Sequence, residues 1–177
     1  MFDKMDKTDY KVLTFLLDQP DESYYLRQIA TILNISPSAA KKAIDRLEKL
    51  DLIIPENIAH LRMFSVRKDD VRIKHLKIIK NMEYIRNIKL KEQIENQKTQ
   101  THAIILFGSY ATGDNTMKSD IDILVIGSKE RISIDAQKEI NIQSFTWTEW
   151  KKNKTVNKAF YDDIIRHGIA LKGEVPV

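Results

Sequence analysis

Two apolar runs joined by a short polar segment constrain the fold of this 177-residue chain more than any other feature. They are HAIILF at 102–107 and SDIDILVIG at 119–127, and each has the length of a buried β-strand. The second run carries two aspartates, Asp120 and Asp122, near its start. Because side chains alternate across a strand, both carboxylates project from the same face. The sequence therefore predicts two buried strands with a pair of carboxylates at the N-terminal end of the second.

A pair of neighbouring carboxylates is costly unless a cation joins it. Their repulsion amounts to roughly 1 kcal/mol in water and more when they are desolvated. Magnesium, or manganese in its place, is the natural candidate, since it binds carboxylates together with substrate phosphates. The first run ends at Gly108 and Ser109, where a glycine lets the backbone approach a ligand and the following amides and the hydroxyl can hold an anion. We therefore predict a nucleoside triphosphate with its phosphates on Gly108 and Ser109 and its metal ions on Asp120 and Asp122, an arrangement suited to nucleotidyl transfer.

The whole segment GSYATGDNTMKSDIDILV, residues 108–125, resembles the signature of the DNA polymerase β nucleotidyltransferase superfamily, in particular its minimal nucleotidyltransferase branch. The shared pattern is Gly-Ser, then Ala-x-Gly, a loop, and Ser-Asp-x-Asp followed by apolar residues. The resemblance implies an α/β (α+β) domain with a mixed sheet. It also implies that Asp120 and Asp122 are catalytic metal ligands and that Gly108 and Ser109 hold the β- and γ-phosphates.

The family places a third carboxylate on a later strand, where it completes the metal site and can activate the attacking hydroxyl. The corresponding strand here is KEINIQSFTW at 138–147, and its site face would present Asn141 and Gln143. Asn141 is the best match for the third-carboxylate position, and an amide can ligate a metal but cannot take a proton. Glu139 is the nearest carboxylate, although it precedes the expected position.

The first third of the chain has the pattern of three helices and a hairpin. Apolar residues recur with helical spacing at 9–18, at 26–33 and from Ser36-Pro37 to Leu50. The next two segments, LIIPE and LRMFSV, have the pattern of two short strands. Ser36-Pro37 is typical of a helix N-terminus. This order resembles the winged-helix DNA-binding domains of bacterial and archaeal regulators.

The resemblance implies that the polar face of the third helix meets the major groove of double-stranded DNA. That face presents Ser38, Lys41, Lys42 and Arg46, which can contact phosphates or base edges. One departure is Asp51, which stands where a glycine commonly precedes the wing.

The segment between the two modules carries the positive charge of the chain. Residues 67–98 hold ten basic and five acidic residues and account for the net charge of +4. An apolar stripe runs along this segment and consists of Leu76, Ile79, Met82, Ile85 and Ile88. We predict a winged-helix domain at 1–68, one basic linker helix at 69–98 that packs on a domain or a second copy, and a nucleotidyltransferase domain at 99–177. By analogy with other winged-helix proteins, we expect a homodimer.

The remaining composition excludes several kinds of chemistry. The chain has no cysteine, which rules out disulfides and thiolate metal sites, and its four histidines are scattered. We find no signal peptide and no apolar run of membrane-spanning length, so we expect a protein of the prokaryotic cytoplasm with no membrane partner.

Three hypotheses about function follow. The first is an enzyme that transfers a nucleoside monophosphate from a nucleoside triphosphate to a hydroxyl on a protein, a small molecule or an RNA end; among antitoxin-type relatives the acceptor is a toxin. The second is a transcriptional regulator whose degenerate transferase domain only senses a nucleotide. The third, less favoured, is a docking adaptor with neither activity.

Overall fold

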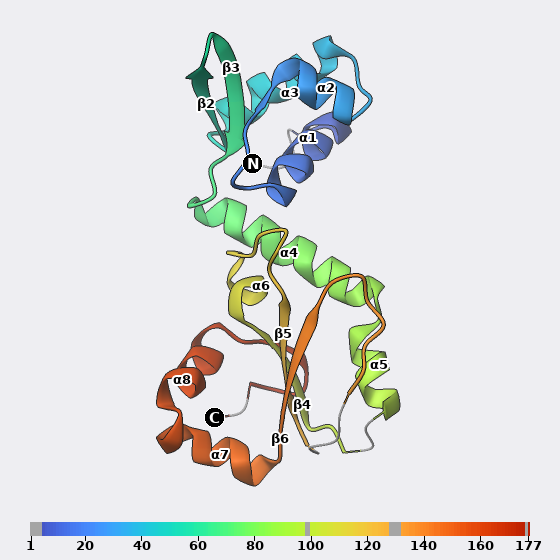
Figure 1. Cartoon of the computed structure of the whole chain (residues 1–177), viewed down its shortest axis with the longest axis vertical. Helices are drawn as coiled ribbons and strands as arrows, with labels where there is room; N and C mark the ends of the chain where they lie inside the picture. Colours follow the sequence, from blue (N-terminus) through green and yellow to red (C-terminus); the bar gives the residue numbers. More distant parts are fainter. Residues whose placement is uncertain (1–4, 98–99, 128–131, 176) are drawn as a thin grey trace. The chain divides into compact units, whose positions relative to one another are not determined.

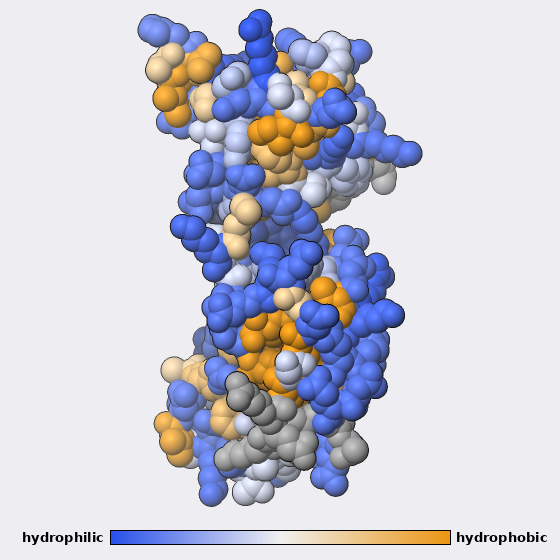
Figure 2. Space-filling model, turned by 45° about the vertical axis from the view of Figure 1, so that its right-hand side comes forward, coloured by the Kyte–Doolittle hydropathy of each residue, from blue (hydrophilic) through white to orange (hydrophobic). Residues whose placement is uncertain are grey.

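The computed structural model of this chain describes residues 5–97, 100–127, 132–175 and 177 (Figure 1). The chain divides into two compact units, Met1–Lys74 and His75–Val177. Hydrophilic residues cover most of the face seen in Figure 2, and hydrophobic side chains reach the surface in patches on both units. Among the helices of the described ranges, none is long and apolar enough to cross a membrane.

The first unit contains three helices and a small sheet. Its elements are α1 (Lys7–Asp18), β1 (Tyr24–Tyr25), α2 (Leu26–Ile32), α3 (Pro37–Lys49), β2 (Ile53–Ile58) and β3 (Leu61–Val66). The strands form an antiparallel sheet in the order β1-β3-β2. The helices and the hairpin confirm the predicted winged-helix fold. Strand β1 was not predicted, because two residues are too few to show an alternating pattern.

Local chemistry explains where the helices of this unit begin and how the wing is reached. Ser36 caps α3 by accepting a hydrogen bond from the amide of Ala39 at 3.2 Å, with Pro37 at the first helical position. Asp51 adopts a left-handed backbone with φ of 58°, so it takes the conformation that a glycine would supply before a wing. Arg67 donates to the Asp51 carboxylate at 2.7 Å. The departure from the usual glycine is therefore accommodated locally.

The second unit is built on a four-stranded mixed sheet, as predicted. Its elements are α4 (Val71–Asn87, which begins before the boundary of the unit), α5 (Leu90–Gln97), β4 (Ala103–Phe107), α6 (Gly108–Thr112), β5 (Ile121–Ile126), β6 (Ile140–Phe145), α7 (Trp147–Val156), α8 (Lys158–His167) and β7 (Ile169–Lys172). The strand order is β6-β5-β4-β7. Strand β4 is antiparallel to both β5 and β7, whereas β5 and β6 are parallel.

The two faces of this sheet pack against different helices (Figure 1). On one face Ile121, Ile123 and Val125 of β5 pack with residues of α4 and α5. On the other face Leu124 and Ile126 pack with residues of α7 and α8. The face of β5 that carries Asp122 is therefore the α7/α8 face, in agreement with the alternation seen in the sequence.

The segment 69–98 differs from the single linker helix that the sequence predicts. It contains two helices, α4 and α5, separated at Lys89, whose φ of 53° cannot continue a helix. Ile85, Leu90 and Ile94 are buried in the core of the sheet. Most of the segment is therefore part of the second unit. The apolar stripe is also incomplete as a packing surface, because the side chain of Ile79 is 58% exposed.

Candidate active site

The Gly-Ser turn lies directly against the second aspartate of the pair. Phe107, the last residue of β4, is paired in the antiparallel ladder with Asp122 of β5, and Gly108 follows it. Gly108 has a φ of 66°, and a Cβ atom at this position would lie 2.5 Å from Asp122 Oδ2. Only a glycine fits there without displacing the carboxylate. The structure thus brings together Gly108 and Asp122, which are fourteen positions apart in the chain.

Ser109 lies in the first turn of α6 and is half-buried. Helix α6 ends at Gly113, whose left-handed φ of 77° turns its amide back to the carbonyl of Ser109. The same carbonyl also accepts from the amides of Asp114 at 3.0 Å and Asn115 at 3.2 Å. The hydroxyl of Thr112 also donates to it at 3.4 Å, so several hydrogen bonds fix the backbone of Ser109.

Asn141 lies beside both aspartates. In the parallel pair of β5 and β6 it is opposite Asp122, and its Nδ2 donates to Asp120 Oδ2 at 3.2 Å. The backbone carbonyl of Glu139, the alternative acid, accepts a hydrogen bond from the amide of Ile121 at 3.0 Å, and the side chain of Glu139 is exposed. The position that the sequence assigns to the third carboxylate is thus close to the aspartate pair, and an amide occupies it.

The electrostatics of the two aspartates favour a cation beside them. Burial raises the pKa of Asp122 above its usual range; the neighbouring amide of Asn141 opposes this shift, and the charge of Asp120 adds to it. Within the ranges described above, neither aspartate forms an ion pair with a lysine or arginine, and no three His, Cys, Asp or Glu residues cluster as a metal site. Two carboxylates and an amide oxygen are hard oxygen donors, which suit Mg²⁺ or Mn²⁺. The residues present therefore fit a divalent cation.

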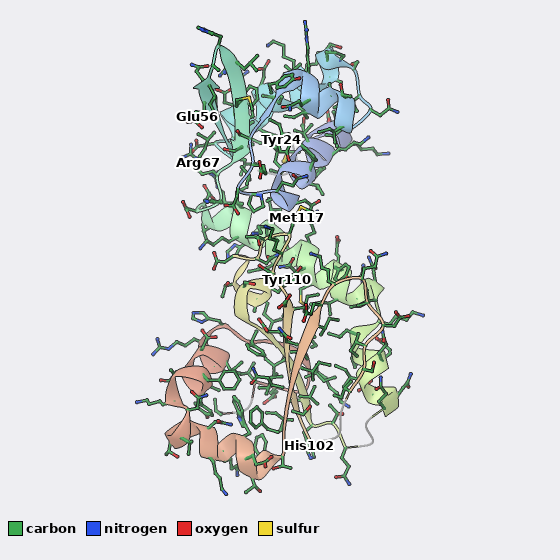
Figure 3. All side chains as sticks on the ribbon, in the orientation of Figure 1. Tyr24, Glu56, Arg67, His102, Tyr110 and Met117 are labelled. Carbon is green, nitrogen blue, oxygen red and sulfur yellow. The ribbon has the colours of Figure 1, made fainter. Side chains whose placement is uncertain are left out.

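Helix α4 supplies site-supporting residues that the sequence reasoning missed. Asn81 Nδ2 donates to the carbonyl of Tyr110 and to Asn115 Oδ1, each at 2.9 Å, and Lys77 Nζ donates to the carbonyl of Asn115. Tyr110, labelled in Figure 3, lies on α6 next to α4. These bonds hold the loop between α6 and β5, which Ser119 closes further by accepting the amide of Thr116 at 2.9 Å. The signal in the sequence was two polar residues one turn apart, Lys77 and Asn81, on the side of the helix that also buries Ile85.

All four residues predicted to contact DNA lie on α3 of the first unit, and three of them have exposed side chains. Ser38, Lys41 and Lys42 are exposed. The hydroxyl of Ser38 lies 3.0 Å from that of the capping Ser36, and Lys41 Nζ pairs with Asp45 at 2.8 Å. Lys42 therefore presents its charge to solvent, and Lys41 shares its charge with a neighbouring carboxylate.

Arg46 is directed elsewhere, and this corrects the prediction of a DNA-facing side chain. Its Nε and Nη2 donate to Asp9 Oδ1 at 3.0 and 2.7 Å, and Nη2 also pairs with Asp6. Asp9 is fully buried, so the guanidinium supplies the partner that a buried carboxylate requires. Arg46 therefore joins α3 to the start of α1 through its guanidinium group.

Comparisons with known proteins agree with this division of the chain. Family models match residues 5–54 as a winged helix-turn-helix DNA-binding domain and residues 88–171 as a nucleotidyltransferase domain. The chain is 37% identical over 75 residues to "Putative protein adenylyltransferase MJ0604" of Methanocaldococcus jannaschii, which covers 38% of this chain and 75% of that protein. It is 32% identical over 81 residues to "Putative protein adenylyltransferase MJ0141" of the same organism, covering 42% and 82%. The chain therefore belongs to the nucleotidyltransferase domain family, and it carries a winged helix-turn-helix module ahead of that domain.

One solved structure, a mutant of ZitR from Lactococcus lactis, is similar with a TM-score of 0.38 and 19% identity over 54% of this chain and 63% of that chain.

Proposed function

We propose that this protein is a Mg²⁺-dependent nucleotidyltransferase that transfers AMP from ATP to a hydroxyl group on a protein. The observation that carries the proposal is the convergence of Gly108, Asp120, Asp122 and Asn141 at the ends of three adjacent strands. The names of the two archaeal relatives support adenylyl transfer to a protein over a small-molecule or RNA acceptor.

The proposed roles follow from the geometry of these side chains. Asp120 and Asp122 would hold the metal, with the amide oxygen of Asn141 as a further ligand, and Gly108 would leave room for phosphate beside them. A bound Mg²⁺ or Mn²⁺ would neutralise the charge of the triphosphate. The acceptor oxygen forms a bond to the α-phosphorus, the bond to the bridging oxygen of the β-phosphate breaks, and pyrophosphate leaves. Asn141 cannot take the hydroxyl proton, so that proton passes to water or to an aspartate.

The direct test is label transfer from α-labelled ATP, CTP, GTP and UTP with Mg²⁺. The protein is incubated alone and with the product of the neighbouring gene. We expect covalent label from ATP on a protein, abolished by Asp120→Ala and by Asp122→Ala. Asp21→Ala, which removes an exposed carboxylate paired with Lys68 in the first unit, is the matched control and should leave transfer unchanged. Label that survives both site substitutions would refute the proposed site.

A nucleotide sensor is the second candidate, and Asn141 favours it. An amide at the third-carboxylate position preserves a metal ligand while removing a base, which is what a binding-only domain needs. In that case the protein binds ATP with Mg²⁺, and no label is transferred with any acceptor. Asn141→Asp then separates the two candidates, because transfer that appears only in this variant identifies the natural protein as a sensor.

The winged helix-turn-helix module is proposed to bind double-stranded DNA through Ser38, Lys41 and Lys42. Replacing both lysines by alanine should weaken duplex binding and flatten its dependence on salt, because fewer counterions are then released. Lys7→Ala, which removes one exposed lysine from the start of α1, is the control of equal charge for Lys42→Ala alone. Unchanged affinity in the double variant would show that α3 does not face the DNA.

Location in the cytoplasm remains a prediction from the sequence.

A further inference from the structure

Strand β6 leaves one edge of the sheet open beside the candidate active site. It is the last strand in the order β6-β5-β4-β7, and in the described part of the chain it pairs only with β5 (Figure 1). Asn141 and Gln143 lie on the face of β6 that continues the face of Asp122, and both side chains are exposed. The open edge of the sheet is therefore next to the residues that would hold the metal.

The hydrogen bonds between β5 and β6 show which backbone groups reach this edge. The carbonyls of Glu139 and Phe145 accept the amides of Ile121 at 3.0 Å and Gly127 at 2.9 Å. In a parallel ladder such residues direct both their amide and their carbonyl to the neighbouring strand, and every second residue does the same. The alternate residues, which direct their amide and carbonyl to the open edge, are Ile140, Ile142 and Ser144.

The two edges of the sheet differ in how they are protected against pairing. Strand β7 has four residues, its register against β4 shifts between Ile104 and Ile105, and it ends at Lys172, which pairs with Glu95 at 2.7 Å. Short length, irregularity and charge all oppose the addition of a further strand. Strand β6 has six residues, pairs in unbroken register with β5 and contains no charged residue or proline. Its edge is therefore suited to receive an extended chain.

The register indicates what such a chain would bring to the site. Asn141 is opposite Asp122, so the next position outward in the same row belongs to the added strand. Because Asn141 directs its backbone to β5, an antiparallel added strand would place a non-hydrogen-bonded pair there, with Cα atoms about 4.5 Å apart and side chains on one face. A hydroxyl at this position would lie beside the proposed metal site.

The neighbouring positions of an added strand would face the opposite side of the sheet. On that side Ile140 and Ile142 pack on the core formed with α4 and α5. Apolar side chains on the added strand would extend this apolar surface, since residues alternate between the two faces. The edge therefore fits an extended segment in which apolar residues flank a residue with a hydroxyl group.

We propose that β6 receives an extended segment of the acceptor protein as a fifth strand, with a serine, threonine or tyrosine opposite Asn141. This inference rests on the proposed transfer to a protein hydroxyl. The hydroxyl oxygen forms the bond to the α-phosphorus, pyrophosphate leaves, and the proton passes to water or to an aspartate. Backbone hydrogen bonds to β6 supply affinity, and the alternation of side chains supplies selectivity.

The first test measures binding without any transfer. The probe is the synthetic peptide Lys-Val-Ser-Val-Ser-Val-Lys, and the readout is hydrogen exchange of the full chain. At about 1 mM peptide we expect the amides of Ile142 and Ser144 to exchange at least about threefold more slowly, because exchange slows by one plus the ratio of ligand concentration to dissociation constant. The amides of β7 should not change, and a peptide with N-methylated valines should give no protection.

Two outcomes of the exchange experiment would overturn the proposal. One is an unchanged exchange rate at Ile142 and Ser144. The other is protection of these amides without peptide in a protein of twice the chain mass of 20.6 kDa, because a second copy would then occupy the edge.

The second test measures label transfer from α-labelled ATP with Mg²⁺ to the same peptide. Ile142→Pro removes an amide at the open edge and leaves the hydrogen bonds between β5 and β6 in place, whereas the matched control Ile142→Ala keeps the amide and loses similar packing. We expect at least about fivefold less label with the proline than with the alanine, at equal ATP affinity in calorimetry. Ser144→Pro against Ser144→Ala repeats the comparison three positions from Asn141, should Ile142→Pro fail to fold.

The two tests separate this inference from the proposed function. Equal labelling by the proline and alanine variants would overturn docking at the edge while transfer stands. Protection of the edge by the peptide, with no label transferred to any acceptor, would support docking and refute the transferase.

Discussion

The substitution Gly108→Ala is the sharpest probe of the candidate active site. Its Cβ would lie 2.5 Å from Asp122 Oδ2, about 0.9 Å inside the 3.4 Å at which ordinary contacts begin. The carboxylate is the end of a rotatable side chain, so it can move away. The substitution is therefore expected to displace Asp122 by about 1 Å while the sheet remains folded.

Two magnitudes follow from this geometry. The φ of 66° at Gly108 costs an alanine about 1–2 kcal/mol of folding free energy, because Cβ crowds the carbonyl in the left-handed region. A displacement of about 1 Å in a metal ligand costs on the order of a hundredfold in rate, and a comparable weakening of metal-dependent binding is expected. Gly108→Ala should thus lose far more function than stability.

Urea unfolding and calorimetric titration with ATP and Mg²⁺ measure the two effects separately. Gly113→Ala is the control, since Gly113 has a φ of 77° at the other end of α6 and carries the same backbone cost. Both variants should lose stability, and only Gly108→Ala should lose most of its nucleotide binding. If Gly108→Ala binds ATP as tightly as the natural protein, the turn does not position Asp122 for the ligand and the reasoning is refuted.

Three other outcomes can be measured on single variants. Asp122→Asn should stabilise the metal-free protein in urea at pH 7 by roughly 1 kcal/mol, because it removes one of two repelling charges. Because the folded-state pKa of Asp122 is raised, ionisation of this carboxyl destabilises the fold, and that cost grows as pH rises through the folded-state pKa. The gain from the variant should therefore vanish below about pH 4, where the carboxyl is protonated in both the folded and the unfolded state. Arg46→Ala should destabilise the protein to urea by about 2–3 kcal/mol, since it leaves Asp9 buried without its cation; a change below about 0.5 kcal/mol would contradict this role. Asn141→Asp should tighten Mg²⁺ binding in calorimetry, and an unchanged affinity would show that residue 141 does not reach the metal.

Strand alternation was sufficient to predict the orientation of the aspartates. Asp122 shares a face with Leu124 and Ile126, as the period of two requires. The family signature then correctly predicted a mixed sheet, and the capping pattern Ser36-Pro37 predicted the start of α3. These features depend on neighbours in the sequence or on a fixed motif, which is why they could be predicted.

Features that depend on packing between distant segments could not be predicted in this way. The helical pattern places Arg46 on the polar face of the third helix, but it does not show that α1 presents the buried Asp9 to this side chain. The same limit applies to Asn81, whose partners lie on α6 and in the loop after it. The sequence predicted that Asn141 takes the third position, whereas its hydrogen bond to Asp120 required the register of two parallel strands.

That register has an evolutionary consequence. Asparagine and aspartate codons differ by a single base, and the backbone that places residue 141 beside Asp122 is set by the ladder of β5 and β6 and not by the side chain. Exchange between amide and acid at this position therefore needs no rebuilding of the sheet or of the turn at Gly108. Under the proposed roles, one point mutation at position 141 therefore separates nucleotide binding from nucleotidyl transfer while the sheet stays the same.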